Sequence, residues 1–468
     1  IGLFISKTLI FITNLMKFIP KILYLLFTIL TFSSCSEKSS AQTDPPVVLT
    51  DDEILTLAQK DAFKYFWDYA ETNSKLARER YHTDDVSNDA NIVTTGGSGF
   101  GLMTIIVGVE RGFVSRTEAV SRLTTALTFL ENADRFHGAW SHWINGTTGK
   151  VIPFGTKDNG GDIVETSFLC QGLLTVREYF KNGNTTEKAL AAKADDLWKG
   201  VEWDWYTKGE NAMYWHWSPN YGWEMNFKLE GYNECLITYV LGAASPTHPI
   251  PAAAYHEAWA RNGAIVNGSS QYGLPVVLNY NGATGNVGPL FWSQYSYLGM
   301  DPRGLTDAYA NYWTLTQNHS KIINKYCIAN PKQWTGYSDK CWGLTASYTR
   351  NTDGSTGYTA HQPLNDTGVI SPTAALSSFP FTPAESMKFL HYLYDEKKST
   401  LVGVAGPYDA FSPHYNWVTP RYLAIDQGTI VPMIENHRTG LIWKLFMQAP
   451  EVKVGLKTLG FSSTQYGF

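Results

Sequence analysis

Positive charge, cysteine and long apolar runs are all scarce in this sequence of 468 residues. Lys and Arg number 37 against 42 Asp and Glu, so there is no basic excess to bind a nucleic-acid backbone. With 44% hydrophobic and only 17% charged residues, the composition excludes a disordered chain. The five cysteines form no CxxC pair, which argues against a zinc site. What remains is a folded protein with a large core.

Several catalytic motifs are also missing. The sequence contains no GxSxG nucleophile elbow, no phosphate-binding P-loop and no HExxH metal motif. Its 11 histidines are scattered, so we expect neither a metal nor a cofactor. The glycine-rich run at 96–101 follows no strand of a βαβ unit, so it predicts a tight loop that opens a helix rather than a dinucleotide site.

Aromatic residues, in contrast, are abundant. They make up 14% of the chain, with 16 Trp and 27 Tyr. Trp and Tyr join an apolar ring to a polar group and therefore suit wet, amphipathic surfaces. Sugars are ligands of this kind, because they have apolar C–H faces and a rim of hydroxyls. The composition therefore favours a carbohydrate ligand.

The N-terminus has the features of an export signal. An apolar run at residues 22–32 follows Lys17 and Lys21 and is succeeded by two serines and Cys35. The run is too short to cross a bilayer, which takes about 20 apolar residues. Cys35 after the serines resembles the lipobox of a bacterial lipoprotein. We therefore expect a lipid anchor at Cys35 and a location in the periplasm or at the outer membrane.

The chain is expected to have three parts. Residues 1–34 are a signal segment, in which residues 1–15 precede Met16 and form a misread start. Residues 35–50 are a tether. Residues 51–468 are read as a single catalytic domain because no Pro/Ser-rich linker interrupts them, and we expect a monomer.

Apolar residues recur at helical spacing through most of this domain. Paired helices with long aromatic loops between them, at 134–161 and 201–229, indicate an all-α toroid of helices rather than a bundle. Loops of this length are usually functional. The first helix follows Asp51, and further helices are predicted at 98–111, 115–132, 162–181, 185–200, 230–243, 250–262, 303–328, 383–396 and 428–447.

Two smaller structural questions accompany this prediction. Short strands are plausible at 151–154 and 213–217. Cys327 and Cys341 flank a loop and could form a disulfide in an exported protein, and the sequence leaves this open.

The first acidic constellation is Asp158, Asp162 and Glu165, at a glycine-rich loop that runs into a helix. Asp162 and Glu165 are three residues apart, so their side chains share a face at the helix start. They could bind or protonate a sugar. An equally physical alternative is a capping box, in which Asp at the N-cap pairs with Glu at the third helical position.

The second constellation is the aromatic loop 214–224 with Glu230 and Glu234 behind it. Several aromatics close together in a loop make a poor core but a good stacking surface. Glu230 and Glu234 are four apart and are predicted to share a helix face. Glu234 enters an apolar run, where desolvation raises the pKa of a carboxyl and suits a general acid. The alternative is two first-turn glutamates favoured by the helix dipole.

The third constellation runs from Arg421 through Asp426 to the polar stretch 435–440. Asp426 is predicted to stand just before a helix, where it could be a cap or a site residue. Glu435, Asn436 and Arg438 lie among apolar neighbours and indicate a buried ionic network or a site lining.

Three motifs together resemble the glucoamylase-like domain family of exported Bacteroidetes proteins, closest to glycoside hydrolase family 144, the endo-β-1,2-glucanases. They are GGDIVETSF (160–168), LEGYNEC (229–235) and IDQGTIVPMIENHRTGLIWKLF (425–446). The resemblance covers roughly residues 51–450. It implies an (α/α)6 barrel and inverting, metal-free hydrolysis of β-1,2-linked glucan.

Site residues follow from the same resemblance. Glu234 matches the glutamate proposed as the general acid of the family. Asp158, Asp162 and Glu165 match its acidic cluster, and Asp426 is a candidate carboxylate on the base side. Inverting hydrolysis needs one carboxyl to protonate the leaving oxygen and a second to activate water.

The substrate-binding candidates are mostly tryptophans, for each of which a core role is an equal alternative. The competing functions are an exo-acting glucosidase, a β-glucanase for another linkage, a non-catalytic glycan-binding lipoprotein and a polysaccharide lyase. The residues expected to bind substrate are Trp140, Trp143, Trp215, Trp217, Trp223, Glu230 and Arg421.

Overall fold

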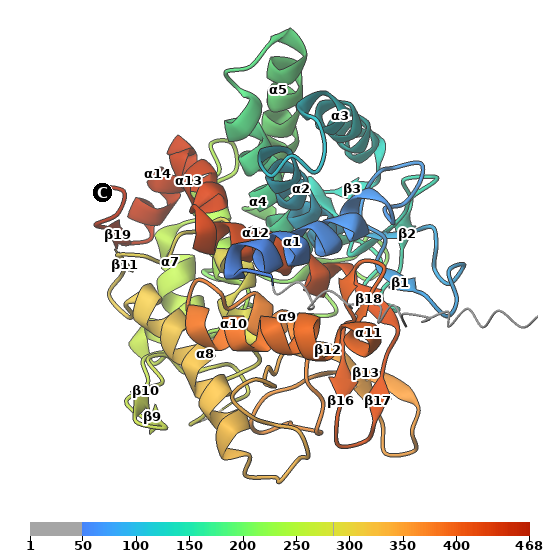
Figure 1. Ribbon diagram of the computed structural model, residues 1–468. Helices are drawn as coiled ribbons and strands as arrows, with labels where there is room; N and C mark the ends of the chain where they lie inside the picture. Colours follow the sequence, from blue (N-terminus) through green and yellow to red (C-terminus); the bar gives the residue numbers. More distant parts are fainter. Residues whose placement is uncertain (1–48, 284) are drawn as a thin grey trace, which may run out of the picture. The chain divides into compact units, whose positions relative to one another are not determined.

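The computed structural model describes residues 49–283 and 285–468 (Figure 1). The predicted signal segment, the lipid-anchor cysteine and nearly all of the predicted tether lie outside the described residues. The α-helices are α1 Asp51–Trp67, α2 Thr95–Glu110, α3 Arg116–Asn132, α4 Ile163–Phe180, α5 Thr185–Lys199, α6 Leu236–Ala244, α7 Ala252–Ala254, α8 Tyr312–Ala329, α9 Pro372–Leu376, α10 Pro383–His391, α11 Lys398–Leu401, α12 Ala424–Arg438, α13 Leu441–Gln448 and α14 Pro450–Thr458.

The strands are short and pair locally at the ends of the helices. They are β1 Arg80–His82, β2 Ile92–Thr94, β3 Arg135–Phe136, β4 Ala139–Trp140, β5 Trp143–Asn145, β6 Val151–Ile152, β7 Gly161–Asp162, β8 His216–Trp217, β9 Ser270–Gln271, β10 Leu274–Pro275, β11 Leu305–Thr306, β12 Ala346–Arg350, β13 Thr356–Ala360, β14 Val402–Gly403, β15 Gly406–Pro407, β16 Phe411–Ser412, β17 Trp417–Val418, β18 Arg421–Leu423 and β19 Ser462–Ser463. All pairs between these strands are antiparallel.

Two burial patterns separate inner from outer helices. α2 and α4 are buried on nearly every side, whereas α3 and α5 each bury one stripe at helical spacing. A helix that is apolar all round belongs in the interior, and an amphipathic one covers it. These helices therefore form two layers, and the fold is the (α/α)6 barrel that the resemblance predicts.

A helix near each end of the described chain takes part in one long-range contact. α12 packs against α1 and α2, although about 360 residues separate α1 from α12 in the sequence. Figure 1 shows α12, in red, beside the blue α1. The contact between α12 and α2 places the third constellation against the glycine-rich run: a Cβ on Gly97 would lie 2.7 Å from Cβ of Ala424.

The glycines at 96–101 lie inside α2 and do not form the predicted loop. A Cβ on Gly99 would lie 2.4 Å from the Leu169 Cα of α4, and one on Gly172 would lie 2.3 Å from the Gly99 carbonyl oxygen. Each glycine in a helix costs about 1 kcal/mol relative to alanine. Because Gly99 and Gly172 have no side chains, the backbones of α2 and α4 can contact each other directly.

Other element boundaries also differ from the prediction. The helix expected at 230–243 begins only at Leu236, and the one expected at 428–447 is two helices that break at Gly440, which has φ +70°. The 250–262 helix is reduced to α7 followed by a π-helical and a 3₁₀ turn. Cys327 and Cys341 are free, buried thiols, so they form no disulfide in the described part of the chain.

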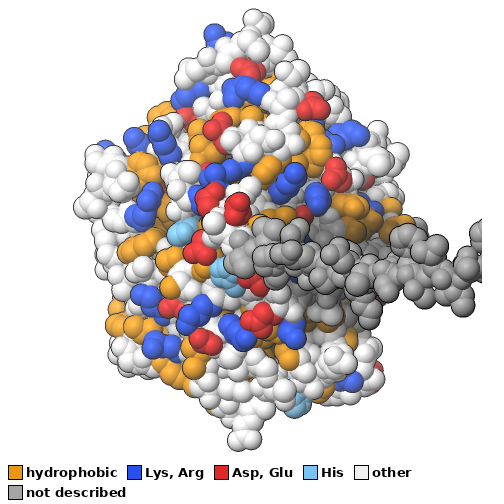
Figure 2. Space-filling view, in the orientation of Figure 1, with side chains coloured by type: hydrophobic (Ala, Val, Ile, Leu, Met, Phe, Trp, Pro, Cys, Tyr) orange, Lys and Arg blue, Asp and Glu red, His pale blue; other side chains and the backbone are white. Residues whose placement is uncertain are grey.

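The surface carries mixed charge. Figure 2 shows Lys and Arg side chains interspersed with Asp and Glu over the visible face. Many charged side chains of the described residues form ion pairs, as in the contact of Lys388 with Asp339 at 2.9 Å. Over residues 49–283 and 285–468, no helix combines the length and apolar character needed to cross a membrane.

Candidate active site

A cavity of about 450 Å³ lies at the N-terminal ends of α2, α4, α6 and α12. Strand β2 leads into α2, and β18 leads into α12. Residues 78–82 connect these two helix starts, because Arg78 pairs with Val93 of β2 and β1 pairs with β18. Backbone N–H groups at helix N-termini are unpaired within the helix and can bind anionic or polar groups. The wall is formed by Glu79, Arg80, Thr94, His142, Trp143, Phe154, Glu165, Phe168, Trp215, Glu234, Phe291, Tyr295, Ala346, Tyr348, Tyr358, Leu423 and Ile425.

Glu234 lines this cavity from the turn that precedes α6. Because α6 begins at Leu236, Glu230 and Glu234 do not share the predicted helix face. Oε2 of Glu234 is buried and has no hydrogen-bond partner among the described residues. Burial raises the pKa of the carboxyl to about 7, with smaller contributions from the charges of Glu165 and Asp162. At neutral pH a substantial fraction of Glu234 is therefore protonated.

Glu165 lines the same cavity from the first turn of α4. It does not complete the capping box, because its Oε2 accepts the backbone N–H of Gly96 in α2 at 2.7 Å. A Cβ on Gly96 would come within 2.5 Å of that oxygen, so only glycine allows this contact. Burial raises the pKa of Glu165, and the charge of Asp162 raises it further against the lowering effect of His142.

Asp162 is the N-cap of α4 and is fully buried. Its Oδ1 accepts the backbone N–H groups of Val164 and Glu165 at 3.0 and 2.9 Å. Its Oδ2 accepts the indole N–H of Trp215 at 3.0 Å and lies 3.1 Å from Nδ1 of His142. Asp162 therefore caps the helix and also holds two residues of the cavity wall in place.

His142 is a site residue that the sequence analysis missed. Its ring stacks on Phe154 with centroids 4.1 Å apart. Burial disfavours the imidazolium, but the charge of Glu165 and the contact with Asp162 outweigh it and raise the pKa of His142 to about 10. His142 thus supplies positive charge between two carboxylates. No motif marked it in advance, because its partners are 20 and 23 residues away in the sequence.

Asp158 stands behind the cavity wall and is 8% exposed. Its Oδ1 lies 3.2 Å from Nε2 of His216, and burial raises the pKa of the carboxyl. His142, Asp158 and Asp162 offer three ligand atoms within 4.8 Å of one another. Both oxygens of Asp162 already face hydrogen-bond donors, so we assign no ion to this cluster.

Asp426 lies in the first turn of α12 and not ahead of the helix as predicted. It is 2% exposed and accepts the hydroxyl of Tyr295, which itself lines the cavity, at 3.1 Å. Burial and the neighbouring Asp409 raise the pKa of Asp426 far above its ordinary value. Asp426 is therefore separated from the cavity by Tyr295, a position that does not suit the predicted base.

The predicted stacking tryptophans are divided between several environments. Trp143 and Trp215 line the cavity. Trp140 is 0% exposed, and its indole N–H donates to the carbonyl of Leu130 at 3.0 Å. Its predicted sugar-stacking role is therefore wrong, because no ring face of Trp140 is accessible.

Trp217 and Trp223 are partly buried and lie outside the cavity wall. Both pack against Trp205, with ring centroids 6.0 and 6.4 Å from it. The tyrosines that line the cavity were not predicted. The β12–β13 hairpin places Tyr348 opposite Tyr358, and tertiary pairing alone brings that hairpin to the helix ends.

The two charged substrate-binding candidates also lie elsewhere. The nearest cation to Glu230 is Arg261, at 3.7 Å, and Arg421 pairs with Asp84 at 3.1 Å. Neither lines the cavity. Glu79 and Arg80, next to each other on the chain, do line it and contact each other at 3.3 Å.

Comparison with known proteins places these observations in a family. Residues 226–450 match the Glycoamylase family model, described as "Putative glucoamylase". A solved endo-β-1,2-glucanase from Chitinophaga pinensis, in complex with sophorotriose and glucose, is 56% identical, with a TM-score of 0.86 over 89% of this chain and 99% of that one. The chain belongs to this glucoamylase-like family, as the three motifs predicted.

Two further relatives come from Parabacteroides distasonis. One is an exo β-1,2-glucooligosaccharide sophorohydrolase acting at the non-reducing end, 44% identical over 449 residues. The other is a solved β-1,2-glucanase, 43% identical, with a TM-score of 0.82 over 88% of this chain and 60% of that one. The match to the sophorohydrolase covers 91% of this chain but only 60% of the relative's length.

Proposed function

We propose that this chain is an exported glycoside hydrolase that cleaves β-1,2-glucan at internal linkages. The observation that carries the proposal is the Oε2 atom of Glu234, which is buried in the cavity and has no hydrogen-bond partner among the described residues. An unpaired, desolvated carboxyl stores a proton at neutral pH, as a general acid must. The β-1,2-glucan substrate comes from the named activities of the relatives.

The chemistry is assigned to two carboxyl groups of one cavity. Glu234 donates its proton to the glycosidic oxygen as the bond to the anomeric carbon breaks. Glu165 is the base-side carboxylate, because it shares the cavity and is anchored by the Gly96 N–H. It takes a proton from the water that attacks the opposite face of the sugar. Such inversion requires about 6.5–9.5 Å between the two carboxyls, which leaves room for the water.

The neighbouring residues position these groups and the substrate. Asp162 holds His142 and Trp215 from behind the wall. Burial raises the pKa of Glu165, but the cation of His142 and the Gly96 N–H act in the opposite direction and favour the ionised form that a base requires. Trp143 and Trp215 offer rings on which sugar faces can stack.

Endo action is favoured over exo action by the strength of the two matches. The endo-acting relative is 56% identical and is covered over 99% of its length, whereas the exo-acting one is 44% identical and covered over 60%. Exo action is the second candidate, because the sophorohydrolase is 44% identical to this chain over 449 residues.

The deciding experiment is incubation of residues 36–468 with linear β-1,2-glucan, followed by chromatography and reducing-end assay. Endo action predicts a ladder of oligosaccharides at early times, and a single product size would instead establish exo action. Inversion predicts that the α-anomer appears first in ¹H NMR spectra. If no glucan of any linkage is cleaved while binding persists, the chain is a glycan-binding protein and the proposal fails.

A further inference from the structure

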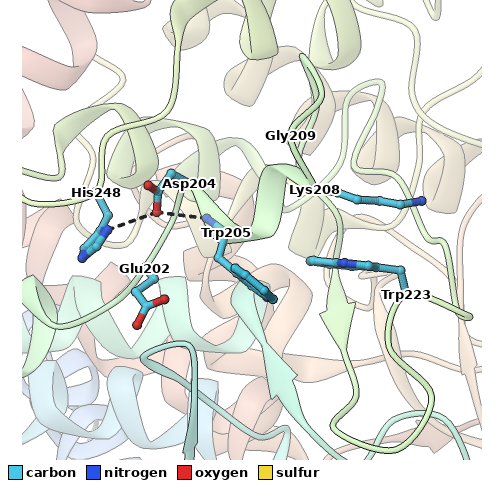
Figure 3. Close-up of a pocket in the computed structure, with 7 residues that line it drawn as sticks. All are labelled: Glu202, Asp204, Trp205, Lys208, Gly209, Trp223 and His248. Carbon is cyan, nitrogen blue, oxygen red and sulfur yellow. Dashed lines mark hydrogen bonds and ion pairs between the residues drawn. The ribbon is translucent and has the colours of Figure 1, made fainter.

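A second pocket, of about 430 Å³, lies outside the catalytic cavity (Figure 3). Its walls come from the loop after α5, from the aromatic loop and from the loop after α6. None of its lining residues belongs to the catalytic cavity. The six that matter here are Glu202, Asp204, Trp205, Lys208, Trp223 and His248.

Trp205 offers one free face to this pocket. It is 39% exposed, while Trp203, two residues earlier, is fully buried. One face of Trp205 is covered by His137, which stacks on it with centroids 3.5 Å apart and planes 12° apart. The exposed part of the ring that lines the pocket is therefore the opposite side.

Trp223 forms a second aromatic wall beside Trp205. Their ring centroids are 6.4 Å apart and their planes differ by 33°. Figure 3 shows the two indoles next to each other in the pocket. Tyr206 and Tyr214 contact Trp223 edge-on, and Trp217 contacts Trp205 edge-on. The two platforms are thus held before any ligand arrives, which lowers the entropy cost of binding.

The polar rim of this pocket contains hydrogen-bond donors and acceptors, and side chains of both positive and negative charge. Asp204 Oδ1 lies 3.2 Å from Nδ1 of His248 and accepts the backbone N–H of Trp205 at 3.0 Å. Glu202 adds a second carboxylate, and Lys208 adds an ammonium. Two carboxylates against one lysine argue against a phosphate or uronate ligand, because an anion would be repelled. Neutral hydroxyl groups can use both kinds of partner.

We propose that this pocket binds a pyranose unit of the glucan chain, as a second carbohydrate site on the same molecule. The identity of the sugar rests on the proposed function. The site lies on the other side of the β7–β8 pair: Trp217 stands opposite Gly161, and the adjacent Asp162 contacts the wall of the catalytic cavity. A long chain that binds both sites is retained by the second while the first turns over.

The proposal is tested by comparing long and short substrates in Trp205→Ala. The variant is expected to raise KM for polymeric β-1,2-glucan about tenfold, the size of effect that loss of one stacking contact produces. The kcat/KM for the shortest cleaved oligosaccharide stays unchanged, because that substrate occupies only the cavity. Migration in a native gel that contains the polymer should be less retarded than for the wild type.

Tyr221→Ala is the matched control, since Tyr221 is 37% exposed on the aromatic loop but does not line the pocket. It should behave as the wild type. If Trp205→Ala loses its fold, Trp205→Leu keeps apolar volume against His137 without an aromatic face and should give the same result.

Two outcomes overturn the proposal. The first is that folded variants show the KM and the gel retardation of the wild type. The second is that kcat/KM falls equally for short and long substrates, which would mean that Trp205 acts on catalysis in the cavity itself. Failure of the proposed function is recognised separately. The wild type would then cleave no β-1,2-glucan, while gel retardation by a panel of glucans still reports on Trp205.

Discussion

The N-termini of α3 and α4 carry the same spacing of a capping residue and a glutamate but use it differently. At α3, Ser115 and Glu118 close a reciprocal capping box on the exposed surface. Hydrogen bonds from Ser115 lower the pKa of Glu118. The glutamate spends its hydrogen-bonding capacity on its own helix, and the result is local stability.

At α4 the same spacing does not form a reciprocal capping box. Asp162 accepts the backbone N–H of Glu165, but Glu165 turns away to the Gly96 N–H of α2. Burial raises the pKa of Glu165, opposite in direction to that of Glu118. The two helices differ in their surroundings and not in their motif. Because Gly96 of the neighbouring helix α2 donates its N–H to Glu165, this glutamate lines the cavity instead of capping its own helix.

Unlike Glu118, Glu234 makes no capping hydrogen bond at the start of α6. Its substitution is predicted to have the largest effect. Glu234→Gln keeps the shape but removes the proton, so kcat should fall by about 10²–10⁴-fold. Polymer binding and the melting temperature should change little. Steady-state kinetics with thermal melts measure both, and a variant that retains turnover would remove Glu234 from the acid role.

Glu165→Gln paired with Glu118→Gln tests the comparison directly. Gln at position 165 cannot act as a base, so we expect kcat to fall by about 10²-fold. Glu118→Gln should leave activity unchanged and stability nearly unchanged, because Gln also serves in a capping box. Equal effects of the two substitutions on kcat would contradict the distinction between the two helix starts.

The carboxyls of Glu234 and Glu118 are also predicted to change the stability of the fold in opposite directions as the pH rises. Burial raises the pKa of Glu234 from its ordinary value of 4.5 to about 7 in the fold, so the folded state holds its proton over that interval while the unfolded state has lost it. Stability from this group is present below about pH 4.5 and is lost as the pH rises through about 7. Glu118, with a lowered pKa, contributes stability above its unfolded pKa that is lost on acidification.

Denaturant melts at pH 5 and pH 8 check this sign. From pH 5 to pH 8 the wild type should lose about 1–3 kcal/mol relative to Glu234→Gln. The rate should also fall as the pH rises through about 7, because the acid loses its proton. A constant difference between the two proteins across this range would refute the buried, protonated state of Glu234.

Ser115→Ala is predicted to have the smallest effect and concerns stability alone. Loss of the N-cap hydrogen bond should cost about 1 kcal/mol. Activity on β-1,2-glucan should stay at the wild-type level, since α3 contributes no residue to the cavity wall. A loss of activity in the folded variant would show that the capping box of an outer helix affects the cavity, and would contradict a purely local role for Ser115.

Local sequence determined much of the helical framework. The helices at 116–132, 163–180 and 185–199 lie within one or two residues of their predicted bounds, because apolar periodicity and capping residues act within a few positions. Two of the three glutamates that line the cavity, Glu165 and Glu234, were also named in advance. Their motifs lie in loops that end at helix starts, where polar residues are visible in the sequence.

The tertiary structure decided what those residues face. Trp140 and Trp143 are three positions apart, yet one is core and the other lines the cavity. The glycines of α2 were read as a loop because their partner, Gly172, lies more than 70 positions away. The protonated form of His142 is stabilised by the carboxylates of Glu165 and Asp162, which belong to other elements. Burial and close approach depend on residues that only the folded chain brings together, and no local pattern records them.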